Sequence, residues 1–374
     1  MKNNPFLISG YISPDYFCDR EIESEMITDA IRNRRHLTIF SPRRIGKTGL
    51  IKHVFYSGKQ KKYFVPVYMD ILSTGSLKEF TESFGRSVLS ALATNDSALR
   101  KILKRLASIR PKAGIDSITG EPYISLTVSN EKEAIDSLET VFRYLQAQKK
   151  HFALAIDEFQ QVADYPEKNV EALLRTHIQQ TLNVSMIFSG SRKHILSHIF
   201  SSPDRPFYNS TQMMELGKIE YESYKSFITE NFERNGIKTD PTAIDLILGI
   251  TSAHTFYVQY LCNRLFSNEK KISSEAVQRM LVRIINENEA VYASYISLLT
   301  PLHFRILRAI SANGGVQNPT SSEFLSSYDL GAASSVSLAI KSLMDKGFLD
   351  LNTGKYTLND LFFNSWLKYK DGSL

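Results

Sequence analysis

The sequence predicts an α/β protein, in which a parallel β-sheet with helices is followed by a helical region and then by a small module of helices and strands. Three observations predict this organisation. Short apolar runs alternate with helical patterns up to about residue 215, the alternation then stops, and after residue 298 three helical patterns precede two short strands. We therefore expect three domains, at residues 1–215, 216–298 and 299–374, with a β-hairpin inserted into the first near residues 113–129.

The composition is that of an ordinary globular protein, with 43% hydrophobic and 22% charged residues among 374. No apolar run approaches the roughly 18 residues of a membrane helix, and the first residues lack the pattern of a signal peptide, so we expect a cytoplasmic protein that does not enter a membrane. Cys18 and Cys262 lie far apart and outside any Cys/His cluster, which indicates neither a disulfide framework nor a zinc site. The net charge of +6 is compatible with an acidic partner but does not require one.

The first chemical signal follows an apolar run at residues 37–40. It reads Ser41-Pro42-Arg43-Arg44-Ile45-Gly46-Lys47-Thr48, and a helical pattern begins with Gly49. A strand, a short loop, Gly-Lys-Thr and a helix form a P-loop, whose backbone N–H groups point at a phosphate chain. We expect all nine residues to bind a nucleotide, with Lys47 at the β- and γ-phosphates and the Thr48 hydroxyl at Mg²⁺. Ser41 replaces the usual first glycine, so any strained turn there must form without glycine's freedom of φ; the alternative is a solvated basic turn.

A second apolar run, at residues 152–156, ends in Asp157 and Glu158, which is the Walker B arrangement. At the carboxyl end of a parallel strand, both carboxylates would face the crevice where such sheets bind ligands. Asp157 would then hold Mg²⁺, and Glu158 would orient or deprotonate an attacking water. Two solvated acids at a strand end are the alternative, which the preceding P-loop makes less attractive.

A third buried strand, at residues 183–188, ends in Ser189, Gly190 and Ser191. In the same crevice, Ser189 or Ser191 could sense the γ-phosphate, although serine is also a common turn former after a strand. Three cations are candidates to stabilise negative charge in the transition state, within the chain or across a subunit interface. They are Arg192, which follows the strand directly, Lys193 and Arg205.

Two basic or amphipathic segments leave their roles open. Residues 16–35 form a turn and an amphipathic helix that could either cover the adenine or cap the sheet edge. The densest basic patch runs from Arg100 to Lys112 and is either a solvated helix face or a footprint for nucleic acid or another anionic partner.

The last region has the order of a winged helix, with helices expected at 302–310, 321–327 and 332–346 before two strands joined by a Thr-Gly turn. Such modules often place the third helix in the DNA major groove. Its expected exposed residues are Ser334, Ser335, Ser337 and Lys341, and bases and acids nearly balance between residues 300 and 374 (seven against six). Because that is weak electrostatic support for DNA binding, DNA and a protein partner both stay open.

With these motifs in this order, the chain resembles the archaeal-type prokaryotic ATPases of the STAND/AAA+ group of P-loop NTPases, relatives of origin-recognition ATPases. The likeness covers nearly the whole chain. The matching pieces are Tyr16-Phe-Cys-Asp-Arg-Glu21, Ser41 to Thr48, Ala155-Ile-Asp-Glu-Phe159, Ser189-Gly-Ser191, His254 to Tyr260, and Gly354-Lys-Tyr356 with Trp366. The resemblance implies ATP and Mg²⁺ as ligands, with Arg20 of the Phe-x-x-Arg-Glu motif beside the nucleotide. It implies ATP instead of GTP, since no Asn-Lys-x-Asp sequence occurs.

The sequence also departs from the family pattern. Residues 253–255 lack the glycine and proline that usually open the lid helix, and residues 206–210 lack an arginine common in the family, so turnover could be slow. Our first hypothesis is a Mg²⁺-dependent ATPase switch, in which ATP held between the α/β domain and the helical lid fixes the position of the winged helix. The alternative is a DNA-binding or regulatory module with a largely structural nucleotide. A homo-oligomer and a protein-recruiting scaffold remain open.

Overall fold

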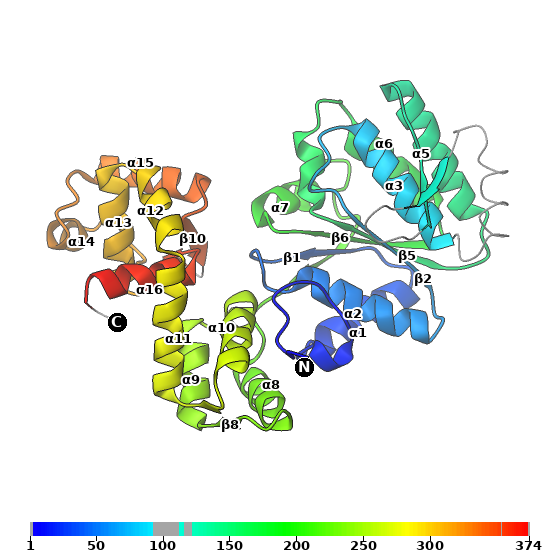
Figure 1. The fold of residues 1–374 in the computed structure, drawn as a ribbon. Helices are drawn as coiled ribbons and strands as arrows, with labels where there is room; N and C mark the ends of the chain where they lie inside the picture. Colours follow the sequence, from blue (N-terminus) through cyan, green and yellow to red (C-terminus); the bar gives the residue numbers. More distant parts are fainter. Residues whose placement is uncertain (1–2, 93–111, 116–121, 353, 373–374) are drawn as a thin grey trace. The chain divides into compact units, whose positions relative to one another are not determined.

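A computed structural model describes residues 3–92, 112–115, 122–352 and 354–372 (Figure 1). The chain forms two compact units. One is Ser9–Ile219, and the other combines Met1–Ile8 with Glu220–Leu374, so the backbone passes between them twice. In the described ranges, no helix is long and apolar enough to cross a membrane.

The first unit is built on a five-stranded sheet with the order β2-β5-β6-β1-β7, and every neighbouring pair of strands is parallel. Its strands are β1 (Leu37–Phe40), β2 (Val65–Asp70), β5 (Phe152–Asp157), β6 (Val184–Gly190) and β7 (Gln212–Glu215). The parallel sheet expected from the sequence is confirmed. The edge strand β7 was not anticipated, because its four residues, Gln-Met-Met-Glu, carry none of the β-branched or aromatic side chains that indicate a strand.

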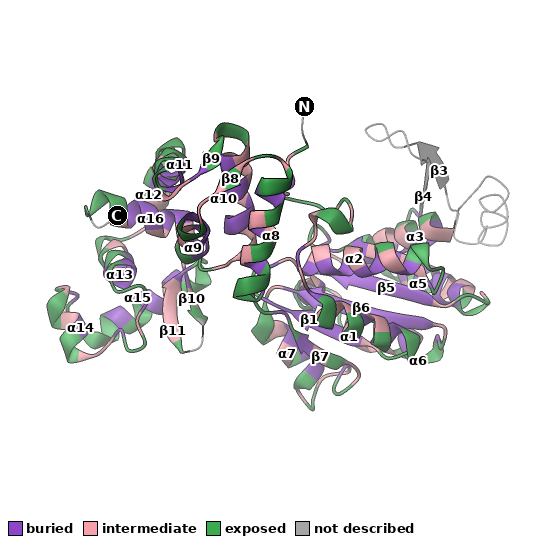
Figure 2. Cartoon of the chain, turned by 90° about the horizontal axis from the view of Figure 1, so that it is seen from below, coloured by how far each residue is buried: buried purple, intermediate pink, exposed green. Residues whose placement is uncertain are grey.

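Helices cover both faces of this sheet, and each face has its own apolar core. One core is formed with α1 (Glu21–Arg32) and α2 (Lys47–Gln60). The other is formed with α3 (Leu77–Leu92), α5 (Glu131–Gln146), α6 (Val170–Gln180) and α7 (Lys193–Ser201). Figure 2 shows the buried strands between these layers.

The alternation of side chains along β5 explains how α2 reaches the end of that strand. Phe152, Leu154 and Ile156 enter the core with α3, α5 and α6, whereas Ala153 and Ala155 enter the core with α1 and α2. Two small alanines allow close packing of α2, and the next residue of the same face is position 157.

Between α3 and α5, strands β3 (Lys112–Ile115) and β4 (Pro122–Ser125) pair antiparallel, in the region where we expected an inserted hairpin. The basic segment that runs from Arg100 to Lys112 lies outside the described residues, apart from the backbone of Lys112 at the start of β3.

In the second unit, helices occupy the region where we expected a helical lid, and we keep the name lid for them. Its helices are α8 (Tyr221–Arg234), α9 (Pro241–Ile250), α10 (Thr255–Asn268), α11 (Ser274–Glu287) and α12 (Glu289–Ser297), with a short parallel pair of β8 (Lys238–Thr239) and β9 (Lys271–Ile272). One helix was expected over residues 273–298. Two are found, because Asn288 ends α11 and its side-chain amide donates to the Ile284 carbonyl at 2.8 Å.

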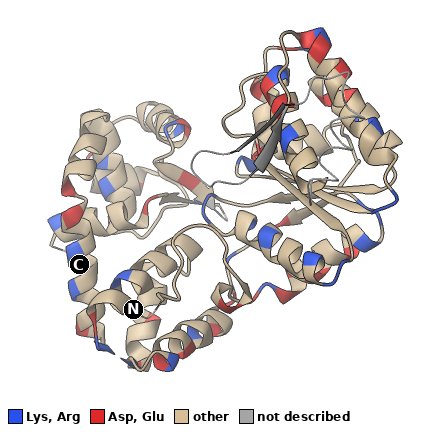
Figure 3. Cartoon of the chain, turned by 45° about the vertical axis from the view of Figure 1, so that its right-hand side comes forward, with Lys and Arg blue, Asp and Glu red and all other residues tan. Residues whose placement is uncertain are grey.

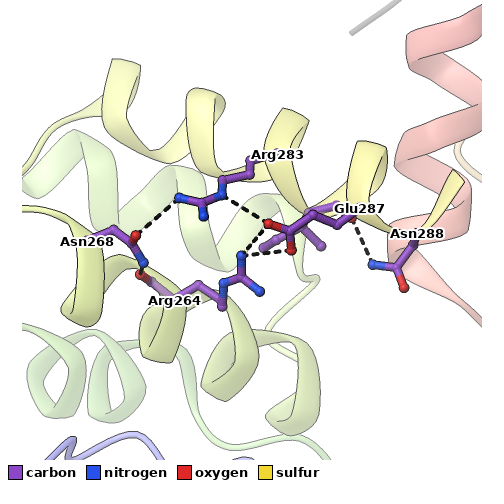
Figure 4. A network of polar contacts seen from close by, with 6 residues as sticks. Arg264, Asn268, Arg283, Glu287 and Asn288 are labelled. Atoms are coloured by element: carbon purple, nitrogen blue, oxygen red, sulfur yellow. Dashed lines mark hydrogen bonds and ion pairs between the residues drawn. The ribbon is translucent and has the colours of Figure 1, made fainter.

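Polar contacts join α10 and α11 in the lid (Figure 4). Arg264 donates to both carboxylate oxygens of Glu287, at 2.7 and 2.8 Å. Arg283 donates to Glu287 and to Asn268 Oδ1, at 3.0 and 3.1 Å. The two guanidinium groups therefore share one carboxylate and link the ends of neighbouring helices.

The amino-terminal segment packs on this lid. The Phe6 ring is fully buried, with its centroid 4.7 Å from that of Phe232. Asn263 Nδ2 donates to the Phe6 carbonyl at 2.7 Å, and Asn4 Nδ2 donates to the Asn263 carbonyl at 3.0 Å. Residues 3–8 thus pack against helices that lie more than 200 residues later in the sequence.

The winged-helix order expected from the sequence is confirmed. It consists of α13 (Pro301–Ala312), α14 (Ser322–Ser327), α15 (Ala333–Asp345), the antiparallel strands β10 (Leu349–Asn352) and β11 (Lys355–Leu358), and a final α16 (Leu361–Lys370). Ser334, Ser335, Ser337 and Lys341 are all exposed on α15, together with Leu338.

Helix α16 ties the winged helix to the lid within this unit. Tyr257 donates to the Asn359 carbonyl at 3.1 Å, and its ring centroid lies 5.0 Å from that of Phe362. Both rings are buried, so the lid and the winged helix share a packed apolar interface.

Candidate nucleotide-binding site

The P-loop connects the carboxyl end of β1 to the start of α2. Its left-handed residues are Arg44, with φ 63°, and Gly46, with φ 110°. Ser41 continues β1, where its N–H donates to the Gly190 carbonyl at 3.4 Å, so glycine's freedom is not needed at this first position. Pro42, Arg43 and Arg44 are exposed, Ile45 is buried in the core with α1 and α2, and Gly49 lies in α2.

Lys47 begins α2 and is only 6% exposed. Burial lowers the pKa of its ammonium group, while Glu158 and then Asp157 act to raise it. A buried cation is stable only with anionic partners. The site therefore holds a positive charge that an anionic ligand such as phosphate would complement.

Asp157 is the centre of the polar network and is only 2% exposed. Thr48 Oγ1 and the Tyr68 hydroxyl donate to its Oδ2 at 2.5 and 2.9 Å. Ser189 Oγ and the Glu158 N–H donate to its Oδ1 at 2.5 and 3.0 Å. These four hydrogen bonds offset the energetic cost of burying the carboxylate, and they fix its orientation.

Strand alternation brings these groups together. Asp157 lies on the face of β5 that Ala155 shows to α2, and Ser189 lies on the corresponding face of β6, two residues after Ile187. Tyr68 lies on the α2 face of β2, opposite Ala155 in the β2–β5 register. Its burial and the neighbouring Asp157 raise the pKa of its hydroxyl. Tyr68 was not predicted from the sequence, although the alternation in β2 could have indicated it.

The Thr48 hydroxyl and the Asp157 carboxylate offer hard oxygen ligands that suit Mg²⁺. Among the residues that the structure describes, no group of three or more His, Cys, Asp or Glu side chains could hold a metal ion alone. Mg²⁺ commonly binds one or two protein ligands together with phosphates and water.

Glu158 lies directly after β5 in a left-handed conformation, with φ 56°. Ser191 Oγ donates to its Oε2 at 3.0 Å, so the structure brings together two residues that the sequence proposed as catalytic. Gln160 Nε2 donates to the same oxygen at 2.5 Å. Gln160 was not anticipated, because a glutamine after a strand has no distinctive signal.

The three candidate cations each pair with a carboxylate. Arg192 lies 3.5 Å from Asp164, in the segment that follows Glu158, and Lys193 Nζ donates to Glu215 at 2.8 Å. Arg205 pairs with the buried Glu171 of α6. Burial raises the pKa of Glu171, and the neighbouring Arg205 lowers it.

In the Phe-x-x-Arg-Glu motif, the phenylalanine and the arginine contact different parts of the first unit. Phe17 stacks on His53 of α2 with ring centroids 4.2 Å apart. Arg20, which is 5% exposed, donates to the carbonyls of Gly217 and Lys218 at 2.6 and 3.4 Å and to Glu23 at 2.7 Å. The structure thus places Arg20 on the segment that leaves the sheet after β7, while Phe17 lies over the P-loop helix.

Two family models match parts of the chain. A family model described as an ATPase domain predominantly from Archaea matches residues 17–261, and one described as a probable winged helix domain matches residues 290–369. No curated protein matches the chain.

Similar solved structures include a Walker-type ATPase of Pyrococcus abyssi, with TM-score 0.65, 15% identity, and 97% of this chain and 99% of that one covered. The Aeropyrum pernix ORC2 protein, solved as ADPNP–ADP complexes, has TM-score 0.57 and 15% identity, with 99% and 98% covered. The Aeropyrum pernix ORC1 protein, solved with DNA, has TM-score 0.52 and 15% identity, with 96% and 95% covered. At this identity the likeness shows the fold.

Proposed function

Since the chain belongs to the family of ATPase domains found predominantly in Archaea, we propose that it is a Mg²⁺-dependent ATPase whose nucleotide state sets the arrangement of its two units. The observation that carries this proposal is the 2.5 Å hydrogen bond between Thr48 and Asp157. It joins the P-loop to the Walker B strand beside Lys47 and Glu158, which gives one site the groups for phosphate binding, metal binding and water activation.

In this proposal, residues 41–49 bind the phosphates of ATP, and Lys47 contacts the β- and γ-phosphates. Thr48 and Asp157 would hold Mg²⁺, which neutralises charge on the phosphate oxygens and orients them when it is bound. Phe17 and His53 offer an aromatic surface over α2 for the adenine.

Glu158 accepts a proton from water as the water oxygen forms a bond to the γ-phosphorus. The bond between that phosphorus and the oxygen shared with the β-phosphate breaks, which yields ADP and inorganic phosphate. Ser191 holds Glu158 and contacts the γ-phosphate, and Arg192 is the cation closest in sequence to this group. Contribution of an arginine from a second copy of the chain is an alternative that sedimentation with nucleotide would detect.

The packed interface between α16 and the lid supports the switch. Because Tyr257 joins the lid to the winged helix, a movement of the lid carries the winged helix with it. ATP shifts such an equilibrium only by its different affinity for the two arrangements, and hydrolysis removes the contacts of the γ-phosphate.

Equilibrium binding of a non-hydrolysable ATP analogue tests the site. The Lys47→Ala variant should lose binding, while Lys59→Ala, which removes an exposed lysine of the same helix, should bind like the parent. If Lys47→Ala bound the analogue as tightly as the parent, the P-loop assignment would be wrong.

A second candidate function is DNA binding with a largely structural nucleotide. The winged-helix match favours it, as does the DNA complex of a structural relative. Against it, Lys and Arg are interspersed with Asp and Glu over the described helices (Figure 3), and α15 exposes serines and one lysine. Salt-dependent DNA binding with negligible ATP turnover would favour this function, whereas turnover that DNA leaves unchanged would favour the first. Charge reversal at Arg100 and Lys101 tests the basic segment as the contact.

A further inference from the structure

Two side chains hold the same oxygen of Glu158. Gln160 Nε2 donates to Oε2 at 2.5 Å and Ser191 Oγ donates to it at 3.0 Å. Gln160 is 3% exposed and lies in a short 3-10 helix, Phe159–Asp164, that directly follows Glu158. The other carboxylate oxygen, Oε1, takes part in neither of these bonds.

The orientation of the Gln160 amide is determined by its surroundings. Its NH₂ group must face Glu158, because an amide oxygen in that position would repel the carboxylate. The amide oxygen is therefore turned toward Gly190, where it is buried without a hydrogen-bond partner among the described residues. An unsatisfied buried oxygen is unfavourable, so packing alone would favour an apolar side chain at this position.

Gly190 supplies the space that this arrangement needs. A Cβ atom added there would lie 1.9 Å from Gln160 Oε1 and 3.0 Å from its Cδ. The last two residues of β6 and the residue after it thus each act on a different side chain of the site. Ser189 donates to Asp157, Gly190 leaves space for Gln160, and Ser191 donates to Glu158.

We propose that Gln160 is a positioning residue, which with Ser191 fixes Oε2 of Glu158 so that Oε1 faces the attacking water. The inference rests on the proposed ATP hydrolysis and deepens it. A group that must accept a proton in the transition state has to be held in one orientation, and two donors on one oxygen achieve this. A buried glutamine with an unsatisfied oxygen is typical of a site where orientation matters more than stability.

The Gln160→Met variant of the full chain tests this role, because methionine keeps the length of the side chain and removes the donor. We expect kcat for ATP hydrolysis to fall by about 10- to 100-fold, as is typical when a supporting hydrogen bond is lost. The Kd of the ATP analogue should change by less than about 2-fold, and the thermal midpoint should hold or rise, because the unsatisfied buried oxygen is gone. Gln161→Met, at the next residue, is the matched control and should retain the parent kcat.

Gly190→Ala provides an independent approach to the same contact. Its added methyl group should displace Gln160 and lower kcat in the same way, and combining it with Gln160→Met should lower kcat no further than the more damaging single change. A purely structural role for Gln160 predicts the opposite pattern, in which the thermal midpoint of Gln160→Met falls and kcat is retained.

The outcomes separate this inference from the proposed function. Parent-like turnover by Gln160→Met would overturn the positioning role while leaving the ATPase intact. A parent protein that releases no phosphate from ATP would overturn both.

Discussion

Replacing Asp157 by asparagine or by alanine should separate the folding role of this residue from its function. The carboxylate accepts four hydrogen bonds, from Thr48, Tyr68, Ser189 and the Glu158 N–H. In Asp157→Asn, the amide oxygen can still accept from Ser189 and Glu158. Its NH₂ group can donate to the Thr48 and Tyr68 hydroxyls, which turn around because a hydroxyl is both donor and acceptor.

The expected magnitudes follow from these partners. Asp157→Asn should lower the free energy of unfolding by less than about 1 kcal/mol. Asp157→Ala leaves the buried Ser189 hydroxyl and the partly buried Glu158 N–H without this acceptor. Since each such group costs about 1 to 3 kcal/mol, the loss should be about 3 kcal/mol. Urea denaturation of parent and variants measures both values.

Turnover should follow a different order from stability. Both Asp157 variants lack the charged oxygen that would bind Mg²⁺, and metal stabilisation of the transition state is worth several kcal/mol, so phosphate release should fall about 100-fold or more in each. The Asp157→Asn protein should thus be nearly as stable as the parent and nearly as inactive as the Asp157→Ala protein. Mg²⁺-dependent turnover by Asp157→Asn at the parent rate would refute the metal assignment, and a stability loss equal to that of alanine would refute the hydrogen-bond account.

Two further predictions concern stability. His36 Nδ1 accepts the Met186 N–H at 3.1 Å, and burial lowers the pKa of this histidine below 6.5. The unfolded chain therefore binds the proton more readily, so the free energy of unfolding should fall as the pH drops below 6.5. Urea denaturation at pH 7.5 and 5 measures this fall, and His36→Gln should make it smaller. A fall of the same size in His36→Gln would contradict the assignment to His36. Ala253 precedes helix α10 with φ 51°, so Ala253→Gly should raise the thermal midpoint by relieving up to about 1 kcal/mol of backbone strain. As a control, Ala339→Gly inside α15 should lower the thermal midpoint. A lower thermal midpoint in both variants would rule out strain at Ala253.

Much of the fold and the centre of the site could be predicted because their signals are local. The P-loop and the strand before Asp157 are contiguous patterns, and strand alternation explains why residues 48 and 157, far apart in the chain, meet. Tyr68 and Gln160 were missed because their roles depend on which strand or loop lies beside them, which the sequence of either segment does not contain. Arg20 was predicted beside the nucleotide, and that role stays a prediction. Its contacts with the Gly217 and Lys218 carbonyls could not be read from the sequence, because carbonyls occur at every residue.

The departures from the family pattern also have structural explanations. Ser41 replaces a glycine at no conformational cost, because the left-handed positions of the loop are residues 44 and 46. Ala253 does occupy a left-handed conformation, so having alanine in place of glycine before α10 strains the backbone at this residue. Domain boundaries and the roles of Arg192 and the winged helix stay predictions.

Phosphate release from ATP by the purified full chain, with Mg²⁺ and with a chelator, tests the central claim most directly when it is combined with Glu158→Gln. We expect release that requires Mg²⁺, and a Glu158→Gln protein that binds the ATP analogue as the parent does but hydrolyses ATP at least about 100-fold more slowly. Release that persists in the chelator, or that Glu158→Gln leaves unchanged, would contradict the account.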